Sequence, residues 1–145
     1  MIAAADAQDR VDQLVVLTGR LTGLLTTEAD AYEARRPHEV AGGAEETARL
    51  ANIYRHEAAR LKAEPELIKG ARADSHKKLI QATEVFEAVL TRHGRAIAAA
   101  KAVTEGLVHA IAEEVAATRA ASTPYGADAR TGETDASAIT LNKRA

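Results

Sequence analysis

The chain has 145 residues, enough for one domain, with a formal net charge of -2 and no cysteine. These values exclude a disulfide-stapled scaffold and a thiolate metal site, and the interspersed charges predict no nucleic-acid partner. Of its hydrophobic residues, 34 are Ala and only 29 are Val, Ile, Leu or Phe. Alanine favours helices but buries little surface, so we expect long helices with thin contact seams.

The chain start and the apolar runs bear on localisation. The first residues, MIAAADAQDR, lack a cationic start, and Asp6 and Asp9 interrupt the apolar run, which argues against a secretory signal. No apolar stretch approaches the roughly 18 residues of a transmembrane helix. We therefore expect a cytoplasmic protein with no stable membrane insertion.

The first predicted helix covers about residues 6–36. Its leucines alternate three and four residues apart, which is the spacing of a heptad seam. Pro37 ends the helix, because the residue before a proline avoids the helical region. The seam consists of Leu14, Leu17, Leu21 and Leu24, widened by Val11, Leu25 and Tyr32.

The second predicted helix covers about residues 38–63. Its seam keeps the same spacing through Val40, Ala44, Thr47, Ala51, Tyr54, Ala58 and Leu61. Gly42 and Gly43 weaken its first turn, since each glycine costs roughly 1 kcal/mol against alanine in a helix. The following EPELIKG contains Pro65 and Gly70 and predicts a loop with at most one helical turn.

The third predicted helix is the longest and covers about residues 74–120. It holds a heptad register without a slip, with Gly94 and Gly106 as interior weak points. The seam positions are Leu79, Thr83, Phe86, Leu90, His93, Ile97, Ala100, Thr104, Leu107, Ile111, Glu114 and Thr118. Ser122 to Pro124 close it. The remaining sequence has no period and is rich in Gly, Thr, Asp and Ala, so we expect a flexible tail.

Together these segments predict an all-α fold, an antiparallel three-helix bundle or helical hairpin with one very long C-terminal helix. Residues 1–121 form the bundle and 122–145 the tail. At 1.5 Å per residue, the third helix outlasts the first by 16 or so residues, from about Glu105. Its apolar stripe then needs another chain, or the helix kinks at Gly94 or Gly106 and folds the stripe back.

Metal binding and catalysis find little support in the sequence. Glu105, His109 and Glu113 lie four residues apart on one helix face, but such a charge ladder is far more often solvated than metal-bound. No Glu is followed three residues later by His, as a di-iron bundle requires. No phosphate loop, zinc protease motif or nucleophile elbow occurs. We expect no enzyme activity, no cofactor and no metal site.

Two features of the tail invite a binding role. Tyr125 either packs locally or anchors in a partner pocket, since Tyr is enriched at interface hot spots. In the final SAITLNKRA, Ile139 and Leu141 lie two residues apart, like one face of an extended contact segment. A homo-oligomeric coiled coil could also use the seams, but Pro37 and the Pro65–Gly70 loop favour a folded-back monomer or small dimer.

A family resemblance rests on two stretches. They are LLTTEADAYEARRPHEVAGGAEETARLANIYRHEAARLKAEPELI and, further along, FEAVLTRHGRAIAAAKAVTEGLVHAIAEEVA. A Leu-Leu-x-x-Glu run, an Arg-Pro break and an acidic-then-Arg-Leu run leading to a Tyr at mid-helix carry the pattern. Over about residues 12–120 the chain resembles the FlgN family of flagellar type III export chaperones, in the style of its alphaproteobacterial members.

The resemblance implies a cytoplasmic, non-enzymatic chaperone that holds hook-filament junction proteins before export. That family binds the amphipathic end of its client through the C-terminal helix region, where the unpartnered stripe also falls. A C-terminal tyrosine linked to docking at the export gate corresponds to Tyr125, and Ile139 and Leu141 become a second contact or a cover for the stripe. The alternative is a coiled-coil structural or adaptor protein without chaperone activity. The client-binding candidates are Val103, Leu107, Val108, Ile111 and Val115.

Overall fold

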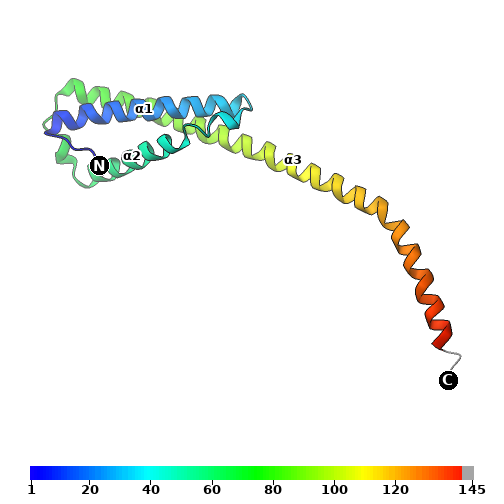
Figure 1. Ribbon diagram of the computed structural model, residues 1–145. Coiled ribbons are helices and arrows are strands. Elements are labelled where there is room, and N and C mark those ends of the chain that lie inside the picture. The colour runs from blue at the N-terminus through cyan, green and yellow to red at the C-terminus, as the bar shows by residue number, and fades with distance from the viewer. Residues whose placement is uncertain (142–145) are drawn as a thin grey trace. The chain divides into compact units, whose positions relative to one another are not determined.

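A computed structural model describes the backbone of residues 1–141 and the side chains of residues 1–122. Its helices are α1 (Ala7–Glu33), α2 (Ala44–Ala63) and α3 (Ala73–Leu141), with short 3-10 turns η1 (Pro37–Glu39) and η2 (Pro65–Ile68) between them (Figure 1). No strand occurs among the residues described, so the predicted all-α class with a long C-terminal helix is confirmed. The chain divides into two units, Met1–Lys101 and Ala102–Ala145.

Both ends of α1 follow from local chemistry. The Asp6 side chain caps the start by accepting a hydrogen bond from the backbone N–H of Asp9. At the other end Arg35 adopts a left-handed conformation with φ 59°, and the N–H of Arg36 donates to the carbonyl of Ala31 at 2.8 Å. This is a Schellman arrangement with arginine in the position that glycine usually takes, and Pro37 prevents any continuation.

The second helix starts later than its heptad pattern predicts. The periodicity suggests a start near His38, whereas α2 begins at Ala44 with Gly43 as its N-cap. Pro37 opens the separate turn η1, and the two glycines that follow have the poorest helix propensity after proline. The break predicted around Pro65 is present as η2.

The bounds of α3 extend beyond the predicted end of the third helix. Gly94 and Gly106 both lie inside it, with helical residues on either side. The helix also continues past Pro124 into the segment expected to be a tail. The predicted division between a bundle of residues 1–121 and a flexible tail stays a prediction.

Side-chain pairs give the direction of the helices in the first unit. Arg20 of α1 pairs with Glu46, and Arg10 pairs with Glu57, so α2 runs antiparallel to α1. Gln8, near the start of α1, hydrogen-bonds Ser75, near the start of α3. Arg92, further along α3, pairs with Asp30 near the end of α1. The first part of α3 therefore runs parallel to α1, and Figure 1 shows the three helices of this unit beside one another.

The core of the first unit is small and leucine-rich, as the composition predicts. Phe86 of α3 packs against Tyr54 of α2, with ring centroids 4.6 Å apart and ring planes tilted by 43°. Leu24 is only half-buried while its neighbour Leu25 is buried, because a straight helix drifts away from an exact seven-residue repeat. The buried cluster consists of Leu17, Leu21, Leu25, Leu50 and Phe86.

Candidate docking surfaces

The second unit carries an exposed apolar stripe on α3. Among the residues with described side chains, every one from 101 to 122 is exposed. The stripe is formed by the predicted client-binding residues Val103, Leu107, Val108, Ile111 and Val115, whose exposed fractions lie between 45% and 61%. Leu107 and Ile111 lie one turn apart, and Val108 and Val115 lie two turns apart, so these aliphatic residues share one side of the helix.

Glu105, His109 and Glu113 lie on the other side of the helix, whereas Thr104, Glu114 and Thr118 fall on the side of the stripe. His109 and Glu113 are one turn apart, with Nδ1 and Oε1 separated by 3.6 Å, and both side chains are more than two-thirds exposed. Glu105 precedes His109 by another turn. Within the part of the chain whose residues are described, no group of three or more His, Asp or Glu side chains is arranged to hold a metal ion. The segment is therefore an amphipathic helix with a narrow charged face.

The predicted export-gate contacts cannot be placed in the same way. Tyr125, Ile139 and Leu141 have side chains outside the described residues. Their roles remain predictions from the sequence.

A cluster of ionic contacts fixes α3 against the end of α1 in the first unit. The guanidinium of Arg92 donates to Asp30 at 2.6 Å and to both carboxylate oxygens of Glu33 at 2.9 and 2.5 Å. The hydrogen bonds from Arg92 hold the pKa of Glu33 below its ordinary value. Next to Arg92, Nε2 of His93 lies 2.8 Å from Glu28. His93, which the sequence placed in the seam, is therefore a partnered polar residue.

A buried ion pair ties α1, α2 and the N-terminal segment together. Glu57 is 1% exposed and accepts a hydrogen bond from Arg10 at 3.0 Å through one carboxylate oxygen. Its other oxygen accepts the backbone N–H of Ile2 at 2.8 Å. The heptad pattern predicted Ala58 at the helix contact, yet Ala58 is exposed and Glu57 is buried. Apolar periodicity cannot detect this contact, because its residues are charged.

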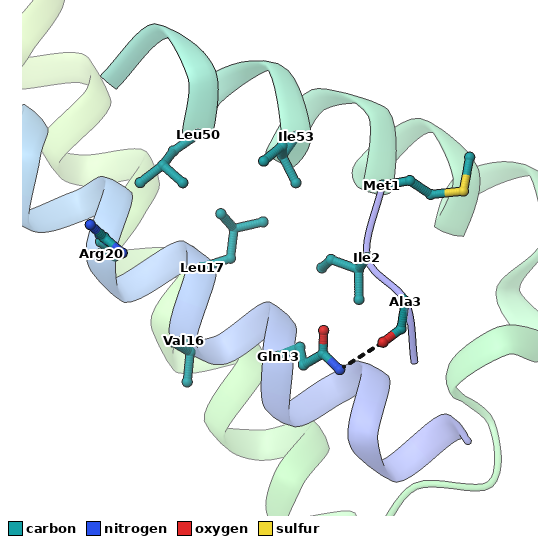
Figure 2. A pocket seen from close by; sticks show the side chains of 9 residues that line it. All are labelled: Met1, Ile2, Ala3, Gln13, Val16, Leu17, Arg20, Leu50 and Ile53. Carbon is teal, nitrogen blue, oxygen red and sulfur yellow. Dashed lines mark hydrogen bonds between the residues drawn. The ribbon is translucent and has the colours of Figure 1, made fainter. Parts of the chain in front are cut away.

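An apolar groove lies beside the Arg10–Glu57 ion pair, between the N-terminal segment, α1 and α2. Figure 2 shows Ile2, Leu17 and Ile53 pointing into it, with the amide of Gln13 donating to the carbonyl of Ala3 at 3.1 Å. The groove has a volume of about 450 Å³. Apolar periodicity does not predict this groove, since Met1 and Ile2 precede the first periodic segment. Its lining is completed by Met1, Val16, Arg20 and Leu50.

Tyr54 links α2 to α3 at the edge of the core. Burial, followed by the negative charge of Glu87, raises the pKa of the Tyr54 phenol, while a side-chain hydrogen bond with Thr83 lowers it. Seven and fourteen residues after Thr83 on the same helix, Leu90 and Ile97 are exposed although the sequence placed both in the seam. Of the row formed by Thr83, Leu90 and Ile97 on α3, only the end at Thr83 is therefore covered by α2.

Within the described residues, no helix combines the length and the apolar character needed to cross a bilayer. Over the described residues the protein is all-helical. Its exposed apolar helix faces are suited to contacts with other proteins.

Comparison with known proteins gives the family. The chain is 53% identical to the flagellar basal-body protein FlbY of Caulobacter vibrioides over 147 aligned residues, which cover 99% of each chain. It therefore belongs to the FlbY family of flagellar proteins. No protein-family model matches the chain, and no solved structure matches it. The flagellar part of the predicted resemblance is confirmed, whereas membership of the FlgN family belongs with the proposal below.

Proposed function

We propose that this protein is a cytoplasmic, non-enzymatic export chaperone of the flagellum that holds the amphipathic end of a hook-filament junction protein. The observation that carries the proposal is the exposed aliphatic stripe of α3, from Val103 to Val115. Soluble chains seldom leave a row of five aliphatic residues in water unless another molecule covers it. The flagellar setting is supported by the relative, which is a flagellar protein.

The mode of binding follows from the shape of the stripe. Leu107 and Ile111 with Val115 offer contacts at helical spacing, which an amphipathic client helix can match. Fully burying one such side chain contributes roughly 1.5–3 kcal/mol, and the half-exposed ones here contribute less. A contact of this size is reversible, as a chaperone that releases its client for export requires.

The tail residues are assigned to delivery in this proposal. Tyr125 anchors the protein at the export gate, and Ile139 with Leu141 provides a second short apolar contact. Deleting residues 137–145 should weaken binding of the client or of the gate protein without changing the thermal melt of the bundle. A truncated protein that binds both as tightly as the full chain would remove Ile139 and Leu141 from the mechanism.

A second candidate function is a structural or adaptor role without chaperone activity. The relative is named as a flagellar basal-body protein, which favours this role. Sedimentation separates the two: a chaperone is expected to be a monomer or small dimer, and a structural rod to form longer assemblies. Isolated basal bodies that retain the protein stoichiometrically would favour the structural role.

The decisive experiment replaces two stripe residues with acids. Leu107→Asp with Ile111→Asp is expected to abolish binding of a purified hook-filament junction protein, because two charges cannot be buried unpaired. The matched control is Ala102→Asp with Ala116→Asp, which adds the same charge on the opposite side of the same helix. Calorimetry measures affinity, and circular dichroism checks that helicity is kept. Equal binding by the two double variants would refute the stripe as the client site.

A further inference from the structure

Two aliphatic residues of the first unit lie exposed on an otherwise packed helix. Leu90 and Ile97 of α3 are 47% and 40% exposed, whereas Phe86 and Ala96 on the same helix are buried. Leu90 and Ile97 are seven residues apart, two helical turns, so they occupy one row along α3. This row is distinct from the residues assigned to client binding.

Upstream, the same row is covered by α2. Thr83, seven residues before Leu90, lies close enough to the phenol of Tyr54 of α2 to lower its pKa. The Tyr54 ring also packs on Phe86. Both side chains that precede Leu90 on this side of α3 therefore meet a helix.

Leu90 and Ile97 are not covered by α2, because α2 is shorter than α1 and does not reach them. Glu46, in the first turn of α2, pairs with Arg20, while α1 continues to Glu33 and remains joined to α3 there through Arg92. The connection that contains η1 packs against α1. Within the described part of the first unit, that connection still leaves Leu90 and Ile97 exposed.

We infer that Leu90 and Ile97 form a docking site for an amphipathic α-helix of a partner protein, laid along α3 where α2 no longer reaches. A helix is the expected occupant, because the row continues the interface on which α2 already packs. Gly94 lies between the two residues, and a Cβ atom added there meets nothing within 4 Å. A partner helix can therefore approach the backbone of α3 closely at this point.

A second copy of the chain fits this site less well. Two half-exposed side chains supply far less than the roughly 800 Å² per partner that a stable dimer needs. The same area suits a weak and transient contact with a foreign helix that presents aliphatic residues at one-turn spacing. None of the residues of this docking site belongs to the stripe, but Leu90, Ile97 and Ile111 share one heptad register of α3, so separate variants are needed to distinguish this site from the client site.

Site-specific crosslinking in cells tests the occupant. A photoreactive amino acid replaces Ile97 in one strain and Ile80 in a second, Ile80 being an aliphatic residue of α3 that is 61% exposed and lies off the row. During flagellar assembly, the Ile97 probe is expected to capture an amphipathic helix of another protein, and the Ile80 probe is not. Adducts between two copies of this chain, equal capture at both positions, or no capture at Ile97 would each overturn the proposal.

Titration with the captured segment then tests the residues. The probe is a synthetic peptide spanning the crosslinked helix, added to the full-length protein. Leu90→Ser with Ile97→Ser should weaken binding about tenfold or more, and the control Ile80→Ser with Val85→Ser less than about twofold. Because Ile80 and Val85 are also exposed aliphatic residues of α3, the two variants carry matched changes. Similar affinities for the two would contradict the docking site.

The Leu107→Asp/Ile111→Asp variant separates this proposal from the chaperone function. It should bind the peptide normally while losing the hook-filament junction protein. If it keeps the junction protein and Leu90→Ser/Ile97→Ser loses the peptide, the chaperone site fails and the docking site stands. If Leu107→Asp/Ile111→Asp loses the peptide as well, the docking site at Leu90 and Ile97 is wrong.

Discussion

Thr18 is the least satisfied residue of the core. Its side chain is 1% exposed, and its hydroxyl oxygen has no hydrogen-bond partner among the described residues. A buried hydroxyl without a partner costs about 1–3 kcal/mol. Thr18→Val, which replaces the hydroxyl with a methyl group of similar size, is therefore expected to stabilise the protein by about 1 kcal/mol.

Thermal denaturation followed by circular dichroism measures this effect. For a chain of 145 residues, a gain of about 1 kcal/mol raises the Tm by roughly 2–4 °C. Thr18→Ala serves as the control, because it removes the same hydroxyl but leaves a cavity and gains less or destabilises. A Thr18→Val protein that melts below the wild type would mean that the hydroxyl has a partner after all.

The pair of Arg92 and Glu33 gives the stability of the first unit a pH dependence. Hydrogen bonding from Arg92 lowers the pKa of Glu33 below its ordinary value of 4.5. A carboxyl whose folded pKa is depressed stabilises the fold above its unfolded pKa, and this stabilisation is lost as the pH falls through the folded value. Arg92→Ala should therefore lower the Tm at neutral pH and have less effect in acid.

Melting curves at pH 7 and well below pH 4.5 test this expectation. Arg95→Ala removes the same charge from an exposed position three residues further along α3 and is the control. Both partners of the ion pair are exposed, so the difference in Tm at pH 7 should be small. An Arg92→Ala effect that grows in acid would contradict the assigned direction.

At the scale of the helices, Gly94 weakens α3 without a compensating contact. A Cβ atom there meets nothing within 4 Å, and the backbone is helical. Gly94→Ala should therefore stabilise the first unit by about 0.5–1 kcal/mol, since alanine loses less conformational entropy in a helix. Urea denaturation measures the gain, and a lower midpoint would indicate that α3 requires a flexible point at this residue.

Apolar periodicity predicted that the three helices exist, but it predicted their bounds and their buried residues less accurately. Leu14, Leu17 and Leu21 are buried as expected, because an amphipathic helix reveals its inner face through spacing alone. The start of α2 was wrong by about six residues, since the apolar pattern continues through Gly42 and Gly43 while helix propensity does not. Leu90 and Ile97 share the seam pattern but remain exposed, because coverage depends on where another helix ends.

The charged contacts could not be predicted from the pattern at all. Arg10 and Glu57 lie 47 residues apart in the chain. Arg10 stands one heptad before Leu17 but is charged, so an apolar pattern passes over it, and Glu57 lies outside the predicted seam of the second helix. Which arginine meets which carboxylate depends on the register of two helices, which loop lengths do not fix. The stripe was predictable as a pattern, since Leu107, Ile111 and Val115 are spaced by single turns, although its role as a client site remains a proposal.

The two units of the molecule differ in how much apolar surface they bury. The buried cluster, which includes Leu17, Leu50 and Phe86, lies entirely within residues 1–101, and no residue from 102 to 122 is buried. A chain truncated after Lys101 is therefore expected to keep the thermal melt of the full protein within a few degrees, because stability follows buried apolar area. If the proposed chaperone function is right, the same truncation should lose all binding of the hook-filament junction protein.

Circular dichroism and calorimetry on the truncated chain test both parts of this prediction. A chain ending after Ser122, which keeps the stripe, is the matched control and should bind. A large fall in the melting temperature on removing residues 102–145 would mean that the second unit stabilises the first.

The pairing of α1 with its two neighbours also sets an order of folding. Contacts between α1 and α2 join residues as close as 26 apart, such as Arg20 and Glu46, whereas those between α1 and α3 join residues 59 to 67 apart. Closing the shorter loops loses less chain entropy, so the α1–α2 hairpin is expected to form before α3 docks. During synthesis α1 and α2 leave the ribosome first. The leucine face of this hairpin therefore stays exposed until the segment of α3 that contains Phe86 has emerged.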